Sequence, residues 1–325
     1  MSTLTSQEGK PALAPGSKFV RKHLDATRSE EFWFHDGSII LLVGSQMFRV
    51  HQTVLSTHSE VFAGLFTVPQ SSDKEKDMIE GCHVVQLHDN PTDFVDLLKG
   101  IYSPSHFDTL PEELGDVLSW VSGILRLSTK YMVLSLRQRC LSILKAKFPT
   151  TFADYAAQAT HPHRKHYKSD DLMRVVLLAQ ECNVLEILPY AYYCVARIGL
   201  SRIVSEPPGD ISWKQKAICL VGRERLRWAE MSLSHSFLFA FRPATSCRTP
   251  GQCGIGHGPQ KEWRAIEAGR SPHPLKLFAR WDALHVCAEC VASAQKQHQA
   301  GREEVWQHLP IIFELDAWEE LRKNA

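Results

Sequence analysis

The sequence predicts an α+β protein in which a strand-containing core comes first and helices follow. Residues 39–43 form an apolar run and residues 47–50 an alternating one, and the Gly44-Ser45 pair between them predicts the turn of a β-hairpin. Beyond the hairpin, apolar residues recur mostly three or four apart as far as residue 235, the spacing of amphipathic helices. From residue 244 the chain becomes rich in Gly, Pro, Thr and Cys. We therefore expect a mixed core, an all-α extension and a cysteine-containing C-terminal region.

Composition sets broad limits on the function. A chain of 325 residues is long enough for two or three cores, and a net charge of +1 gives no reason to expect nucleic acid as a partner. Residues 1–18 are small and polar without the apolar centre of a signal peptide, and no later apolar run approaches the length of a membrane span. We expect a soluble, intracellular protein, cytoplasmic or nuclear, that makes no contact with a membrane.

The nine cysteines fit a reducing compartment, where disulfides are not expected. Several of them fall inside apolar helical patterns, where a thiol behaves as a small hydrophobic side chain: Cys140, Cys182, Cys194 and Cys219.

The apolar pattern changes its period at His51. From there one inward stripe on a broken pair of helices is predicted, made of Val54, Leu55, His58, Val61, Phe62, Leu65 and Phe66. His51 and Ser59 are the polar residues of this stretch that invite a catalytic interpretation. We expect both to be structural residues with satisfied hydrogen bonds instead.

The stretch resembles the BTB/POZ domain, and more closely the BTB-containing proteins that are abundant in fungi. The family pattern has an Asp at the first strand, Phe-x-x-His before the first helix, Val-Leu after it, then Ser-x-x-Phe and an apolar-Phe pair. This chain supplies the pattern in order and without gaps at Asp36, Phe48, His51, Val54, Leu55, Ser59, Phe62, Leu65 and Phe66. The resemblance implies a small mixed sheet flanked by helices over residues 30–147. It also implies an interaction motif made of Asp36, Phe48, His51, Leu55, Ser59 and Phe62.

The rest of this half of the chain is predicted element by element. Residues 19–33 are expected to form a short helix, either a dimer-interface arm as in the family or a frayed terminus. Residues 83–87 alternate like a strand, which in BTB domains pairs with the first hairpin. A helix is predicted over residues 91–102, with Asn90 as its cap and Pro91 in its first turn. Two more helices follow over residues 114–128 and 133–147. Ser128-Thr129-Lys130-Tyr131 matches the family's junction between the last two.

We divide the chain into a polar tail and arm (1–29), the BTB/POZ domain (30–147), a helical extension (148–235) and a C-terminal helical region (236–325). In the extension, helices are predicted after Asp170-Asp171, over residues 188–200 and over residues 213–232. The three histidines of residues 161–166 lack nearby carboxylates or cysteines and favour a solvated loop over a metal site. Helices over residues 291–308 and 317–323 complete the prediction, the second packing Trp318 and Leu321 on the body.

The constellation with metal-ligand character is Cys247-x5-Cys253 together with Cys287-x2-Cys290. Cys-x-x-Cys at the start of a helix places two thiolates within reach of one tetrahedral zinc, and the helix N-terminus favours the thiolate form. Five intervening residues exceed the usual two to four in the first pair, so His257 is an alternative ligand. The hypothesis is one structural zinc; the alternative is two unrelated pairs of reduced thiols.

The sequence has no nucleophile elbow, phosphate loop, zinc-protease helix or dinucleotide fingerprint, so we predict neither an enzyme nor a small-molecule substrate. The resemblance implies a protein-binding module, a homodimer or an adaptor. One alternative is a substrate adaptor of a cullin-RING ubiquitin ligase, for which Leu110-Pro111-Glu112 is a weak match to an apolar-x-acid motif. Another alternative is a transcriptional regulator, but the clustered Lys/Arg residues that phosphate binding requires are missing.

Overall fold

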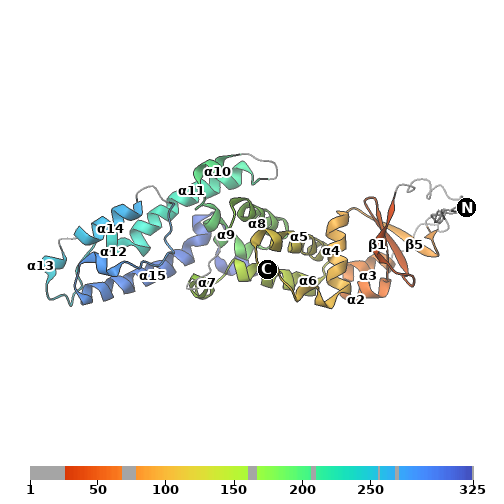
Figure 1. Ribbon diagram of the computed structural model, residues 1–325, viewed down its shortest axis with the longest axis horizontal. Helices are drawn as coiled ribbons and strands as arrows, with labels where there is room; N and C mark the ends of the chain where they lie inside the picture. The colour runs from red at the N-terminus through yellow and green to blue at the C-terminus, as the bar shows by residue number, and fades with distance from the viewer. Residues whose placement is uncertain are drawn as a thin grey trace, which may run out of the picture. The chain divides into compact units, whose positions relative to one another are not determined.

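A computed structural model describes residues 26–67, 78–159, 167–205, 210–254, 257–267 and 271–323 (Figure 1). The chain divides into two compact units. Unit 1 comprises Met1–Thr109 and Ser122–Gln138, and unit 2 comprises Leu110–Val121 and Arg139–Ala325. The predicted fold class is confirmed, because a small mixed sheet with helices comes first and helices make up the remainder.

Unit 1 contains a five-stranded sheet in the order β1-β3-β2-β5-β4. The strands are β1 Thr27–Trp33, β2 Ile39–Val43, β3 Gln46–Val50, β4 Met78–Ile79 and β5 Cys82–Leu87. The predicted hairpin is the antiparallel pair β2 and β3, turned at Gly44 with a φ of 58°, and β5 pairs with β2 in parallel. All five residues of β2 are buried, which is why its sequence is continuously apolar instead of alternating.

The helix expected over residues 19–33 is wrong for its second half, because residues 27–33 form strand β1, parallel to β3. Residues 19–25 lie outside the described ranges. The two inward residues of β1, Ser29 and Phe32, are three apart, and Phe32 N donates to Ser29 Oγ at 3.1 Å. The register with β3 shifts between Arg28 and Trp33. This irregularity breaks the two-residue alternation of a strand and gives a spacing that resembles a helix.

Three helices of unit 1 follow the prediction: α2 Gln52–His58, α3 Glu60–Thr67 and α4 Pro91–Tyr102. On α2 and α3 the stripe is narrower than predicted, since Leu55 and Phe62 are fully buried while His58 is exposed. His58 is the last residue of α2, beyond the packed part of that short helix. Asn90 caps α4 as expected, its side chain accepting hydrogen bonds from Thr92 N and Asp93 N.

Two longer helices, α5 Leu114–Lys130 and α6 Leu134–Lys147, confirm the predicted pair to within two residues at either end. At their junction Met132 turns with a φ of 53°. The neighbouring Tyr131 stacks on Phe62 with ring centroids 4.3 Å apart, and its hydroxyl donates to Asp89 Oδ2 at 2.5 Å. The junction therefore locks α5 to the helices and loops of the sheet domain.

Unit 2 continues with helices only. They are α7 Phe152–Ala159, α8 Ser169–Glu181, α9 Leu188–Val195, α10 Leu200–Val204, α11 Trp213–Ala229, a π-helical turn Glu230–Ser234, α12 Ser236–Phe239, α13 Pro250–Cys253, α14 His257–Glu267, α15 Ala288–Ile312 and α16 Trp318–Lys323. Short 3₁₀ turns lie at Leu185–Ile187 and Trp281–Leu284 in this unit, and at Pro104–Phe107 in unit 1. Trp318 and Leu321 of α16 are buried as predicted, with Trp318 Nε1 donating to the carbonyl oxygen of Trp306. The ring of Trp306 packs among Tyr155, Tyr190 and Trp318.

The C-terminal half of unit 2 is built along α15, which packs against α11, α12 and the π-helical turn (Figure 1). A second aromatic cluster fills the space around it: Phe237, Leu238, Trp263, Phe278, Leu284 and Ala294. In the predicted helix over residues 213–232, the expected apolar positions are Ile218, Leu220, Val221, Leu226 and Trp228, and not all of them are buried. Leu226 is buried, but Val221 and Trp228 are exposed.

None of the helices in the described ranges combines the length and the apolar character needed to cross a lipid bilayer.

A buried histidine of α15 makes the stability of unit 2 depend on pH. His298 is 3% exposed; its Nδ1 lies 2.6 Å from the carbonyl oxygen of Ser234, and its Nε2 accepts from Phe278 N at 3.0 Å. Burial lowers the pKa of His298 to about 4. The unfolded chain, with a pKa of about 6.5, therefore binds the extra proton first, and stability is lost as the pH falls from about 6.5 to 4.

We expect this histidine to contribute about 3 kcal/mol of the acid destabilisation of unit 2. Glutamine does not titrate in this range, so His298→Gln should not show this loss. Between neutral pH and pH 4 the unfolding free energy of the wild type should therefore fall by about 3 kcal/mol more than that of the variant. Urea titrations of both proteins across this range measure it. A difference that stays constant with pH would show that His298 is not held neutral.

Candidate metal centre

Four cysteine side chains from three segments of unit 2 meet at the start of α15. Cys247 follows α12 in a turn closed by its own N–H, which donates to the carbonyl oxygen of Ala244 at 2.9 Å. Cys253 is the last residue of α13. Cys287 is the N-cap residue of α15, and Cys290 lies in the first turn of that helix.

The four sulfur atoms lie within 4.8 Å of one another, and none of the cysteines forms a disulfide. The Sγ atoms of Cys247 and Cys287 are 3.7 Å apart. A tetrahedral zinc with Zn–S bonds of about 2.3 Å requires sulfur atoms about 3.8 Å apart. The cluster therefore has dimensions close to those of a four-thiolate site, and it could hold a metal ion.

Polar hydrogens point at the sulfur atoms, as they do around metal-bound thiolates. Ala244 N donates to Cys290 Sγ at 3.3 Å, and Cys287 N donates to Cys253 Sγ at 3.3 Å. The Thr249 hydroxyl lies 3.6 Å from Cys253 Sγ. Such donors offset part of the negative charge on each sulfur and fix its direction.

The two buried thiols of the cluster have opposite pKa shifts. The N–H of Cys287 and the hydroxyl of Thr249 lower the pKa of Cys253 to about 7. Burial raises the pKa of Cys290 to about 12. Four thiols this close cannot all ionise together unless a cation compensates them, and a bound dication makes every one of them a thiolate. All four cysteines could therefore be thiolates together only with a cation bound between them.

The local sequence explains the long spacing in the first cysteine pair. Pro250 starts the single turn of α13, and Cys253 N donates to the carbonyl oxygen of Thr249, so the chain folds back on itself before Cys253. The turn at Ala244 does the same before Cys247. Two reversals within ten residues or so bring together thiols that an extended chain would separate.

The alternative ligand His257 and the histidine-rich loop of residues 161–166 cannot be compared with the cluster. The side chain of His257 and the histidines of residues 161–166 lie outside the described parts of the chain. Among the residues that are described, the four cysteines are the group of potential ligands with metal-site geometry. Four sulfurs around one centre leave no open coordination position, which is typical of a structural site and not of a catalytic one.

The motif residues of unit 1 separate into a buried set and a surface set. Phe48, Leu55 and Phe62 are fully buried, and Ser59 is 2% exposed, its hydroxyl donating to the carbonyl oxygen of Tyr131 at 2.5 Å and accepting from Phe62 N. These four buried residues stabilise the fold. They can affect partner binding only indirectly, by maintaining the structure of the domain.

Asp36 is exposed, and His51 beside it is half-buried. Asp36 Oδ1 is 3.2 Å from His51 Nε2, and this bond lowers the pKa of Asp36. On the other side of the imidazole, His51 Nδ1 is 3.2 Å from the hydroxyl of Tyr102, which also accepts from His51 N. The sequence identified Asp36 and His51 but missed Tyr102. In the sequence Tyr102 looks like one more apolar residue at the end of the predicted helix, and only the fold shows that its hydroxyl reaches the histidine.

The family model for the BTB/POZ domain matches residues 26–147. These residues are a BTB/POZ domain. The match starts at residue 26, so β1 belongs to the BTB/POZ domain. It carries no information on the similarity to fungal proteins, which stays a prediction. No sequence among the curated proteins matches the chain.

The four-cysteine cluster lies outside the matched residues 26–147. BTB/POZ domains are generally interaction modules, so the motif residues of this half of the chain are candidates for partner binding.

Proposed function

We propose that this protein is an interaction protein without catalytic activity, which forms a homodimer through its BTB/POZ domain and recruits other proteins. The observation that carries the proposal is the match of residues 26–147 to the BTB/POZ family. An interaction or adaptor role is what that domain supports in general. The nine free cysteines fit a reducing compartment, cytoplasm or nucleus, in which such an adaptor would act.

The edge of the sheet is the surface that supports self-association. β1 stands at one end of the strand order, and four of its seven residues are exposed. An edge strand offers backbone N–H and C=O groups to a further strand, which is a common way for two chains to pair. A two-fold dimer would use the same surface on both copies.

We expect the full-length chain to elute at high micromolar concentration with twice the mass of one 36.8 kDa chain. Light scattering coupled to gel filtration measures the mass, and hydrogen exchange at high and low concentration locates the interface. Amides that lose protection on dilution should fall within residues 26–147. A monomer at all concentrations, or an interface confined to unit 2, would contradict the proposal.

A cullin adaptor is the second candidate, and the exposure of one motif favours it. Leu110 is 46% exposed and Glu112 is exposed, so the apolar-x-acid triplet is open to a partner. If a cullin binds here, Leu110→Ala should reduce its co-purification with the chain while leaving the dimer intact. Leu277, also 45% exposed but outside the BTB/POZ domain, supplies the control Leu277→Ala.

We further propose that Cys247, Cys253, Cys287 and Cys290 hold one structural zinc ion. Zinc is the metal that four soft thiolates in a tetrahedral arrangement favour, and its absence of redox chemistry suits a structural site. The distances and the N–H donors described above support this assignment. Its role would be to fasten the loop-rich segment between α12 and α15.

A further inference from the structure

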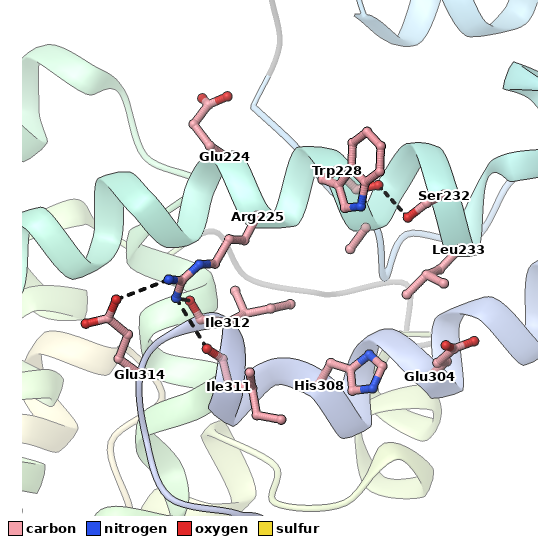
Figure 2. A pocket seen from close by; sticks show the side chains of 11 residues that line it. Glu224, Arg225, Trp228, Ser232, Leu233, Glu304, His308, Ile311, Ile312 and Glu314 are labelled. Atoms are coloured by element: carbon pink, nitrogen blue, oxygen red, sulfur yellow. Dashed lines mark hydrogen bonds and ion pairs between the residues drawn. The ribbon is translucent and has the colours of Figure 1, made fainter.

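A groove of about 860 Å³ runs between α11 and α15 in unit 2 (Figure 2). One wall comes from the last turns of α11 and the π-helical turn and carries Trp228 and Leu233. The other wall comes from the second half of α15 and carries Glu304, His308 and Ile311. The groove lies outside the BTB/POZ domain and away from the proposed zinc ligands in sequence.

Contacts at two places fix the separation of the walls. α15 touches the π-helical turn at Gly301, where any Cβ would overlap the carbonyl oxygen of Leu233. Farther along, Arg225 of α11 donates to the carbonyl oxygen of Ile312 at 3.0 Å and pairs with Glu314 at 3.2 Å (Figure 2). The groove is therefore formed in advance, so a ligand would not have to open it.

The two most exposed large apolar side chains in the described part of the chain face this groove. Trp228 is 69% exposed and Ile311 is 67% exposed. A single exposed apolar residue is ordinary, but these two line the same groove as Leu233 and Ile312, so the groove has an apolar lining. Tryptophan in such a position is the residue type that most often dominates binding energy at interfaces.

The lining of the groove is acidic. It includes Glu224, Glu304 and Glu314 against a single cation, Arg225, and Arg225 is already paired with Glu314. Within the described ranges, Glu304 has no cation within ion-pair distance, and Glu224 has only Arg227, at 3.9 Å. A partner that buries the apolar walls must therefore bring positive charge to the rim.

We propose that this groove binds an amphipathic helix of a partner protein, with apolar residues between Trp228 and Ile311 and Lys or Arg residues next to Glu304 and Glu224. Glu304, His308 and Ile311 are spaced four and three apart on α15, so they line about 10 Å of the groove, or about two helical turns of ligand. A second copy of this chain is disfavoured as the occupant, because two-fold pairing would place the same carboxylates against each other. The groove would be a binding surface additional to the proposed dimer interface, and its binding of a helix does not depend on dimer formation.

The test is a selection of helical peptides on the full-length, metal-loaded chain. A phage-displayed library randomised along a helix of a few turns is enriched on the wild type, and the enriched peptides are synthesised and measured by fluorescence anisotropy. We expect apolar residues at i, i+3 or i+4 and i+7 with basic neighbours. Trp228→Ala and Ile311→Ala should each weaken binding by about tenfold or more. Glu304→Gln should weaken it by about twofold to fivefold, with the effect reduced by salt.

Matched controls separate groove binding from general effects. Trp213 lies on the same helix, is 55% exposed and does not line the groove, so Trp213→Ala should bind the peptides normally. Glu319→Gln on α16 is the corresponding charge control.

Four results would overturn the proposal. The first is that no peptide is enriched, and the second is that the enriched peptides are acidic. The third is that binding survives both groove substitutions. The fourth is a wild-type dimer that Trp228→Ala converts to a monomer, which would assign the groove to a second copy of the chain.

Discussion

Cys290→Ser should abolish the proposed zinc binding and unfold the segment between α12 and α15. Cys290 is 1% exposed in the first turn of α15, and its sulfur is approached by the N–H of Ala244. A serine hydroxyl does not ionise at neutral pH and cannot replace the thiolate ligand. Structural zinc sites contribute about 10–16 kcal/mol of apparent binding energy in isolated fingers, so this loss is the largest expected here.

The measurement is elemental analysis of protein purified without added metal, together with limited proteolysis. Wild type should carry about one zinc per chain and resist cleavage between residues 240 and 287, whereas Cys290→Ser should carry none and be cut there. Cys219→Ala is the control, because Cys219 is buried in α11 outside the cluster and its replacement should leave the zinc in place. A metal-free wild type with a protease-resistant C-terminal region would contradict the assignment.

Acid should reproduce the effect of the substitution. Zinc binding requires four thiolates, so protons compete with the metal, and the affinity should fall as the pH decreases. The thiol of Cys290, with a pKa raised to about 12 by burial, takes up a proton most readily once the metal has left. Zinc release followed with a chromogenic chelator from neutral to acid pH checks this, and release should be reversed on neutralisation with added zinc.

Features fixed by neighbouring residues were predictable from the sequence. The hairpin at Gly44, the Asn90 cap and the two cysteine pairs depend on contacts within a few residues, so the sequence pattern reports them directly. Strand β1 was not predictable in this way, because its register irregularity places its two inward residues, Ser29 and Phe32, three apart and removes the alternation typical of a strand.

Features made by residues distant in sequence were not predictable. The two cysteine pairs could be proposed as partners, but only the fold places Cys247 against Cys287 at 3.7 Å. The groove was missed altogether, since Trp228 and Ile311 each look like members of an ordinary apolar helix face. These two side chains are exposed because of how α11 and α15 pack. That packing is not determined by a local sequence pattern.

Phe62→Ala should destabilise unit 1 by about 3–5 kcal/mol. The ring of Phe62 is fully buried, stacked on Tyr131 at a centroid distance of 4.3 Å and on Phe66 at 5.9 Å. Alanine would leave a cavity beside Tyr131, whose hydroxyl bond to Asp89 fixes the ring and prevents it from collapsing into the space. Because this cavity cannot relax, the destabilisation should lie at the upper end of the range for truncating a core phenylalanine.

Hydrogen exchange of the β2 amides measures this effect, because residues in the centre of the sheet exchange only when the whole unit opens. Phe66→Ala is the matched control, since Phe66 follows on the same helix, is only partly buried and should cost clearly less. A loss below about 1 kcal/mol for Phe62→Ala would mean that Phe62 does not support the core. The presence of Phe62 in the family motif would then require another reason, such as a direct contact with a partner. Its complete burial argues against such a contact.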